Sequence, residues 1–309
     1  MNMKSLANRQ IDFMSKRKIA FAVSALLILA SLVSLVFQQL SLGLDFTGGT
    51  LVEVRYAVAP SLDAVRQTLE SAEFRDVSVQ TFGAANEVLI RLQQAFDADV
   101  GNRVVELLRH GGEEVNLVRA EFVGAQVGDQ LRDQSGLGLL VALGIVMLYV
   151  AFRFQYKFAV GALLALMHDV IIVVGAFSLF QIEFDLTVLA AVLAVIGYSL
   201  NDTIVVYDRI RENIRKSRID DMPAIFNDSL NQTLSRTLAT SGTTLLVLIA
   251  LLVLGGDMIE GFAIALLIGV VVGTFSSIYV ASALLLSVKL NREDLIPTQK
   301  EDPEAEELP

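Results

Sequence analysis

Six apolar runs, each close to the length that crosses a membrane, alternate with polar segments along this chain. They lie at 19–37, 135–152, 158–180, 186–207, 238–254 and 262–288. A helix rises about 1.5 Å per residue, so roughly 20 residues cross a hydrocarbon layer of about 30 Å. The fifth run is the shortest, and we expect its helix to begin near residue 233, inside the polar stretch "NQTLSRTLATSGTT". The pattern predicts a polytopic α-helical membrane protein with six transmembrane helices.

The runs also set the expected domain boundaries. We expect an N-terminal segment at 1–18, a first helix at 19–40, a soluble domain at 41–133, helices two to six within 134–290 and an acidic tail at 291–309. The first run follows a basic cluster, but its core is longer than that of an ordinary signal peptide and lacks a small-residue cleavage site. We interpret it as a retained membrane anchor.

The segment at 41–133 has the alternation of a small α+β domain. The stretches "TLVEVRYAV", "VSVQTF", "VLIRLQ" and "VNLVRAEFVGAQV" have the period of strands, whereas "SLDAVRQTLESAEF" and "ADVGNRVVELLRH" have that of helices. The order βαββαβ predicts a ferredoxin-like α+β fold. The segment has no nucleotide-type glycine loop and no cluster of metal ligands, and its acidic side chains outnumber its basic ones. The pattern favours neither an enzyme nor a metal centre, and we expect no nucleic acid partner.

Composition and charge agree with a membrane protein and predict its orientation. Hydrophobic residues make up 54% of the chain, the net charge is −10, and cysteine is absent, which excludes disulfides. Lys and Arg number 5 before the first run, 2 between the second and third, 6 between the fourth and fifth, and 3 after the sixth. The turns "QIEFD" and "GGDMIEG" on the other side have none. The positive-inside rule therefore predicts that both termini are cytoplasmic and that the domain at 41–133 lies outside.

Asp202 is an ionisable residue in the fourth apolar run. It lies seven residues before Arg209, which should reach the inner headgroups, so its backbone is about 10 Å inside the membrane. Asn201 precedes it, and Ser199 shares its helix face. A low dielectric favours the protonated acid and a nearby cation favours the carboxylate, so such a residue can bind and release a proton. The alternative is a buried acid that serves only as a hydrogen-bonding strut.

Arg236, where the fifth helix begins to cross the membrane, is a candidate partner for Asp202. Its guanidinium stays charged, so it can alter the proton affinity of a carboxylate only by approaching or leaving. Thr237 and Thr240 belong to a run of hydroxyl residues that follows it. The alternative is that Arg236 is only the positively charged anchor of a short span.

His168 and Asp169 are adjacent in the third run, about 16 Å from its start. A proton relay and a fixed hydrogen-bonded pair are equally compatible with them. Gly269 and Gly273 form a small-xxx-small ridge in the last run, which Ser277 continues and which favours close packing against a helix of this chain or another.

Several motifs together resemble one family. "IDFMSKRKIAF" (11–21), "LGLDFTGGT" (42–50), "GYSLNDTIVVYDRIREN" (197–213) and "LSRTLATSGTT" (234–244) are similar to SecF-type members of the SecD/SecF family, relatives of the proton-driven RND transporters. The resemblance covers about 11–290. It implies half of a twelve-helix bundle and a non-enzymatic accessory role in protein translocation.

The resemblance also implies partners and site residues. It implies a complex with SecD beside the SecYEG translocon in the bacterial inner membrane, with YajC and YidC as further partners, besides the exported preprotein and lipids. It assigns the proton pathway to Asp202 and Arg236, with protons as the coupling ion and no other cofactor. The family motif at the membrane exit contains Asp45, Phe46, Gly48 and Gly49. We expect residues 46–49 to be a flexible join, and the alternative is a plain glycine turn.

Two other functions are considered. A half-size RND exporter of small molecules would share the bundle and the proton path, but the domain at 41–133 lacks an aromatic cluster for a drug pocket. An intramembrane aspartyl protease would use Asp169 and Asp202 as a dyad. Those enzymes resemble one another in a Gly-x-Gly-Asp pattern, whereas here Leu200 and Asn201 precede Asp202.

Overall fold

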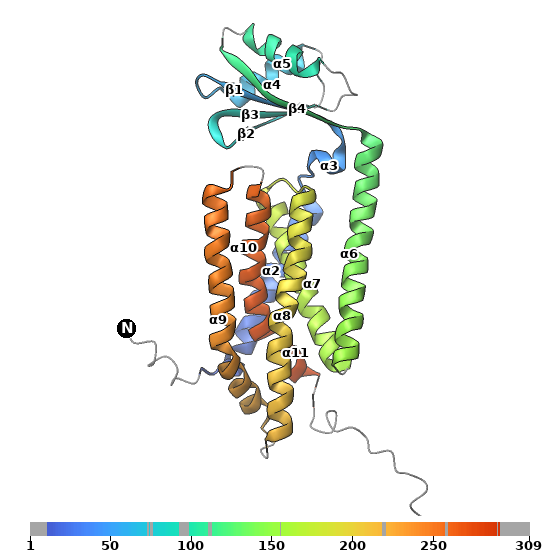
Figure 1. Ribbon diagram of the computed structural model, residues 1–309, viewed down its shortest axis with the longest axis vertical. Coiled ribbons are helices and arrows are strands. Elements are labelled where there is room, and N and C mark those ends of the chain that lie inside the picture. Colours follow the sequence, from blue (N-terminus) through green and yellow to red (C-terminus); the bar gives the residue numbers. More distant parts are fainter. Residues whose placement is uncertain are drawn as a thin grey trace, which may run out of the picture.

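The computed structural model describes residues 11–290, except 73, 75–76, 93–98, 111–112, 155, 218–220, 257–258 and 289. The expected acidic tail at 291–309 and most of the N-terminal segment at 1–18 lie outside the described residues. A bundle of long helices carries a small α+β domain at one end, called here the domain end of the bundle (Figure 1).

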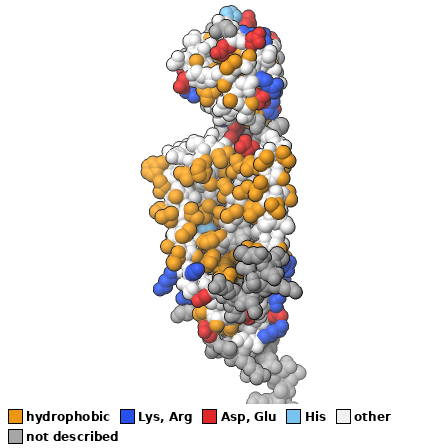
Figure 2. All heavy atoms as spheres, turned by 90° about the vertical axis from the view of Figure 1, so that its left-hand side faces the viewer, with side chains coloured by type: hydrophobic (Ala, Val, Ile, Leu, Met, Phe, Trp, Pro, Cys, Tyr) orange, Lys and Arg blue, Asp and Glu red, His pale blue; other side chains and the backbone are white. Residues whose placement is uncertain are grey.

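Six spans form the bundle, and each is long and apolar enough to cross a membrane. They are α2 (Arg17–Phe37), which follows the short η1 (Met14–Lys16), α6 (Ala125–Arg153), α7 (Tyr156–Phe180), α8 (Leu186–Lys216), α9 (Met222–Leu254), and a sixth span made of α10 (Glu260–Phe275), the π-helical segment η3 (Ser276–Ala281) and α11 (Ser282–Ser287). Figure 2 shows apolar side chains across the middle of the bundle and charged ones near both ends. The six-helix prediction is confirmed.

Three spans extend well beyond their apolar runs. α6 begins at Ala125, within the segment expected to belong to the soluble domain, because its first turns are helical but polar. α8 continues to Lys216, and its extension buries Ile210 and Ile214. α9 begins at Met222, where the Asp221 side chain accepts from the Ala224 amide. Hydropathy detects only the apolar part of a helix, so it could not show these extensions.

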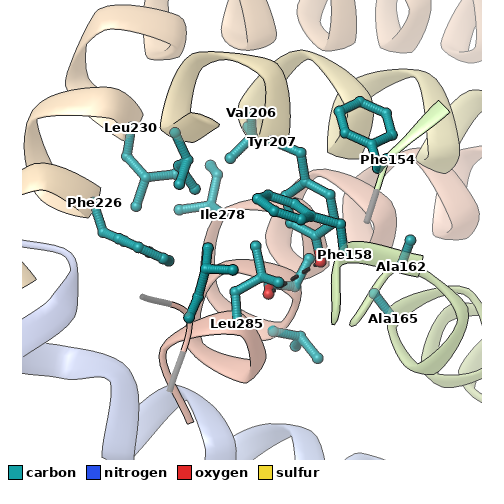
Figure 3. Close-up of a cluster of buried hydrophobic side chains, with 14 of the residues drawn as sticks. Phe154, Phe158, Ala162, Ala165, Val206, Tyr207, Phe226, Leu230, Ile278 and Leu285 are labelled. Carbon is teal, nitrogen blue, oxygen red and sulfur yellow. Dashed lines mark hydrogen bonds between the residues drawn. The ribbon is translucent and has the colours of Figure 1, made fainter. Parts of the chain in front are cut away.

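Aromatic side chains pack among aliphatic ones in the core of the bundle at the end opposite the domain, and Figure 3 shows part of this cluster. Phe158 of α7 packs edge-on against Tyr207 of α8, with ring centroids 5.2 Å apart. The buried Tyr207 hydroxyl donates to the Ala281 carbonyl at 3.2 Å. This contact joins α7 and α8 to the sixth span.

The Gly269 and Gly273 ridge faces α8 of the same chain. A Cβ atom on Gly269 would lie 2.1 Å from Val195 Cγ2, and one on Gly273 would lie 3.0 Å from Ser199 Cβ. The absence of these side chains allows α10 and α8 to approach closely. By contrast, α6 stands beside the bundle and is mostly exposed (Figure 1).

The α+β domain is a four-stranded antiparallel sheet covered by two helices on one face. Its strands are β1 (Gly49–Tyr56), β2 (Ser78–Phe82), β3 (Ala84–Leu92) and β4 (Val115–Val123), in the order β2-β3-β1-β4, and its helices are α4 (Leu62–Ser71) and α5 (Val100–Arg109). Alternate residues of β1, such as Val52 and Val54, are buried in the core beneath the helices. This is the ferredoxin-like order that the sequence predicts.

The opposite face of the sheet looks toward the bundle across a cleft of about 600 Å³. Charged side chains line it from both sides, including Arg119 and Glu121 of β4 and Glu183 between α7 and α8. One ion pair crosses the gap, between Arg91 of β3 and Glu183, at 2.6 Å. Direct packing between the sheet and the ends of α7 and α8 is therefore sparse.

Candidate functional site

Asp202 is buried inside the bundle and is held by hydroxyl groups from two other spans. Its side chain accepts from Thr237 Oγ1 of α9 at 2.8 Å and from Ser277 Oγ of η3 at 2.7 Å. Asp202 is 8% exposed and lies about 24 Å along α8 from the domain end. Each carboxylate oxygen thus has one hydroxyl donor, which replaces part of the hydration that the acid loses on burial.

Asp169 is a second buried acid, held in the same way on α7. It has no exposed surface, and it accepts from Ser199 of α8 at 2.5 Å and from Ser276 of η3 at 2.7 Å. His168 Nδ1 lies 2.8 Å from its other oxygen. His168 is also buried, and its Nε2 atom has no hydrogen-bond partner in the described part of the chain. The structure thus joins His168 and Asp169 to Ser199, which the sequence grouped with Asp202, and to Ser276.

Both acids depend on one segment of the sixth span. Ser276 and Ser277 are the first two residues of η3, and each donates to a different carboxylate. In the sequence, Ser277 stands out only as a continuation of the small-residue ridge, and Ser276 does not stand out at all. Serine is common in membrane helices as a small packing residue, so composition gave no sign of this role.

Arg236 is placed differently from the expectation that it faces Asp202. It lies near the middle of α9 and is exposed on the surface of this chain, as are Asn201 and Thr240. Among the described residues, Arg236 forms no ion pair, and its neighbour Thr237 contacts Asp202 instead. Adjacent residues on a helix point about 100° apart, so only one of the two can face α8. The approach of Arg236 to Asp202 stays a prediction.

A third group of hydroxyls extends from Asp202 toward the domain end. Tyr198 of α8 donates to Ser241 of α9 at 3.3 Å, and Ser241 lies 2.7 Å from Thr274 Oγ1 of α10. The Thr274 carbonyl is 3.0 Å from Ser277 Oγ. Polar atoms therefore follow one another between α8, α9 and α10 within an apolar bundle. In the described part of the chain, no group of three or more His, Cys, Asp or Glu residues could hold a metal ion.

The motif at residues 45–49 is a packed turn in this structure, and its role as a flexible join stays a prediction. Leu44–Thr47 forms the single helical turn α3, and Phe46 is buried against Phe184. Asp45 Oδ2 accepts from the Leu186 amide at 3.1 Å, at the first residue of α8. Gly48 and Gly49 have φ angles of 66° and 115°, which favour glycine. The motif thus caps the helix that carries Asp202.

Comparison with known proteins agrees with this architecture. Residues 103–291 match the family described as protein export membrane protein SecD/SecF, C-terminal, and residues 33–59 match the SecD/SecF GG motif. The chain is 53% identical over 294 residues to protein translocase subunit SecF of Pseudomonas aeruginosa, covering 94% of this chain and 96% of that one. It is 51% identical over 309 residues to the SecF subunit of Vibrio alginolyticus, covering 98% of each.

Two solved structures share the fold. The crystal structure of SecDF, a translocon-associated membrane protein from Thermus thermophilus, has a TM-score of 0.84 and 38% identity over 92% of this chain. A structure of SecDF in a super-membrane-facing form has a TM-score of 0.69 and 39% identity over 91%. This chain spans 39% of the length of each of those chains. With identity above one half along nearly all of its length, the chain belongs to the SecF family of protein translocase subunits.

Proposed function

We propose that this multi-pass membrane protein is the SecF-type subunit of a complex with SecD, and that the complex uses the proton motive force to assist protein export. The complex would act beside the SecYEG channel, after the ATP-driven step that SecA carries out. The Lys and Arg distribution supports an inner-membrane orientation with cytoplasmic termini and a periplasmic α+β domain. The family membership supports the translocase role, and neither alternative function is favoured by the relatives.

One observation carries the proposal: Asp202 is a buried acid at membrane depth whose donors are neutral hydroxyls. An unneutralised carboxylate is costly in this setting, so protonation removes a charge that the surroundings only partly stabilise. The membrane potential contributes about 2.3 kcal/mol per elementary charge per 100 mV. Proton binding and release at Asp202 can therefore bias an equilibrium between two arrangements of the protein.

Exposed polar groups support a partner within the membrane. Arg236, Asn201 and Thr240 are exposed near the middle of the bundle, where a charged side chain facing lipid costs at least about 2.5 kcal/mol. Helices of SecD would cover this face and complete the twelve-helix bundle. In that assembly Arg236 would lie at the edge of the proton path and approach Asp202 in one state of the cycle.

The α+β domain is suited to follow such a cycle. It faces the bundle across a polar cleft and is linked to it there by the Arg91–Glu183 ion pair. The two solved SecDF forms match this chain with TM-scores of 0.84 and 0.69 at nearly equal identity and coverage, which supports at least two arrangements in the family. We propose that the domain holds the emerging unfolded polypeptide in one arrangement and releases it in the other.

The test compares two aspartates of the same helix. Inside-out vesicles containing the complex, SecYEG and SecA would import a reporter preprotein with ATP, with and without a proton gradient. Asp202→Asn is expected to abolish the gain that the gradient produces while leaving ATP-driven import and co-purification with SecD intact. Arg236→Met should have the same effect.

Asp208→Asn is the matched control, because Asp208 is exposed near the end of α8 opposite the domain and its carboxylate lies 3.7 Å from Arg153. This variant should respond to the gradient like the wild type. A full gradient-dependent gain in Asp202→Asn vesicles would refute the proposed function.

A further inference from the structure

The start of η3 connects two acids on two different helices. Ser276 donates to Asp169 of α7 and Ser277 donates to Asp202 of α8, each at 2.7 Å. Consecutive residues point in directions about 100° apart, so one segment can reach both helices only where all three spans meet. π-Helical turns inside α-helices often occur at functional sites. Here the turn places the donors to the two acids on adjacent residues, Ser276 and Ser277.

Each of these serine hydroxyls has a second acceptor close by. Ser276 Oγ is 3.1 Å from the Gly273 carbonyl, and Ser277 Oγ is 3.0 Å from the Thr274 carbonyl. A hydroxyl has one proton to donate and can also accept. It can donate to an ionised carboxylate, or turn to the carbonyl and accept from the protonated acid. Each acid can therefore keep a hydrogen bond to its serine in both protonation states.

His168 gives Asp169 a way to hold a proton that Asp202 lacks. The imidazole Nδ1 and the carboxylate share a contact of 2.8 Å, and Nε2 is buried without a partner among the described residues. With one proton between them, as imidazolium and carboxylate or as neutral imidazole and acid, the pair has no net charge. Without that proton it is a buried anion, which is costly.

The surroundings of this pair contain few other ionisable groups. α2 and α10 have theirs only near their ends, and α11 has none. The groups on the remaining neighbouring spans are Tyr198, Asp202 and Tyr207 of α8, Tyr279 of η3, Tyr149 of α6 and the charged residues at the ends of α6 and α8. At membrane depth, Asp202 is the other acid on these spans.

We propose that His168 and Asp169 form a second proton-binding site, and that the Ser276–Ser277 segment couples its occupancy to that of Asp202. This inference rests on the proposed role of Asp202 and extends it. A proton arriving at Asp202 turns the Ser277 hydroxyl toward the Thr274 carbonyl. The resulting adjustment of η3 changes the donor that Ser276 offers to Asp169. The complex then has two linked proton sites within this subunit.

Histidine NMR can test the second site because the chain has only two histidines. The complex would be reconstituted with ¹⁵N-histidine in this subunit alone, and the exposed His110 would be assigned by its loss in His110→Gln. We expect the His168 signal to change between its neutral and charged forms as the pH is varied. Ser276→Ala removes a donor to the carboxylate, so the proton affinity of the pair should rise about tenfold.

The same His168 NMR signal measures the coupling between the two sites and serves for the controls. Asp202→Asn should shift the His168 midpoint, and Ser277→Ala should reduce the dependence of that midpoint on Asp202. Ser287→Ala is the matched control, since Ser287 donates to the Ala283 carbonyl, away from both acids, and should change nothing. All variants would be compared at equal thermal stability, and Ser276→Thr, which keeps a hydroxyl, should restore the wild-type midpoint if Ser276→Ala is unstable.

The outcomes separate this inference from the proposed function. A His168 signal that keeps one charge state throughout the titration, or a midpoint that ignores both Ser276→Ala and Asp202→Asn, would overturn the second site. Loss of gradient-driven export in Asp202→Asn would still support the proposed function in that case. If His168 titrates but Asp202→Asn vesicles export normally, the second site would stand and the proposed role of Asp202 would be refuted.

Discussion

Gly269→Ala tests how closely α8, the helix that carries Asp202, must pack against the sixth span. The new methyl carbon would lie 2.1 Å from Val195 Cγ2 and 2.7 Å from Cγ1, whereas non-bonded carbons prefer about 3.5–4.0 Å. Valine has essentially one χ1 rotamer in a helix, so it cannot turn away. The helices must separate by on the order of 1.5 Å, which also strains the 2.7 Å bond from Ser277 to Asp202.

Overpacking of this kind costs about 1–3 kcal/mol, or roughly a 5- to 150-fold change in the unfolding equilibrium. The assay is the fraction of purified protein that remains folded in mild detergent against temperature, together with gradient-dependent import. Gly242→Ala on α9 is the matched control, because its Cβ would meet nothing within 4 Å. We expect its stability to equal or exceed that of the wild type.

A second substitution that shortens the clashing side chain tests the same packing argument. Val195→Ala combined with Gly269→Ala should recover part of the loss, since only the Val195 Cβ contact at 3.0 Å would remain close. Equal stability of Gly269→Ala and Gly242→Ala, or no recovery in the double variant, would refute the packing argument.

Three further predictions concern the α+β domain and its attachment. Gly49→Ala should destabilise the protein by about 1–3 kcal/mol in thermal unfolding, because its φ is 115° and a Cβ would lie 2.7 Å from the Leu92 carbonyl oxygen. Asp45→Ala should lower thermal stability by about 1 kcal/mol and speed hydrogen exchange at the Leu186 amide, which loses its acceptor. Burial raises the pKa of Tyr56 well above its ordinary value, and its hydroxyl has no hydrogen-bond partner in the described part of the chain. The unfolded tyrosine loses its proton near pH 10 and the folded one keeps it, so stability should fall as the pH rises above about 10 in the wild type. In melting curves, Tyr56→Phe should match or exceed wild-type stability at pH 7 and lack that part of the decline.

The sequence was sufficient to predict the spans, the domain order and the buried acids. Apolar length and strand period depend on local composition, and an acid inside an apolar run stands out wherever its helix packs. The orientation of each helix about its own axis depends on packing against its neighbours, which cannot be read from a single sequence. For that reason Thr237, and not Arg236, contacts Asp202 here.

Two parts of the site could not be found from local patterns. Ser276 and Ser277 acquire their roles from the π-helical turn and from acids on two distant helices. The glycines at 48 and 49 suggested a loose join, and nothing in the sequence indicated that their neighbours Leu44 and Phe46 are buried. Glycine indicates which backbone angles are allowed and does not show whether the chain moves.

The two covalent links between the domain and the bundle meet at one place. The chain enters the domain through α3 and leaves it from β4 into α6 with only Gly124 between them, and a Cβ on Gly128 of α6 would lie 2.9 Å from the Gly48 nitrogen. A body tethered at a single point can swivel but cannot slide. Because α6 is about 43 Å long, a swivel that carries it through about 10° would sweep its far tip by about 7 Å. Rotation of the α+β domain at one membrane surface would in this way move the end of α6 at the opposite surface.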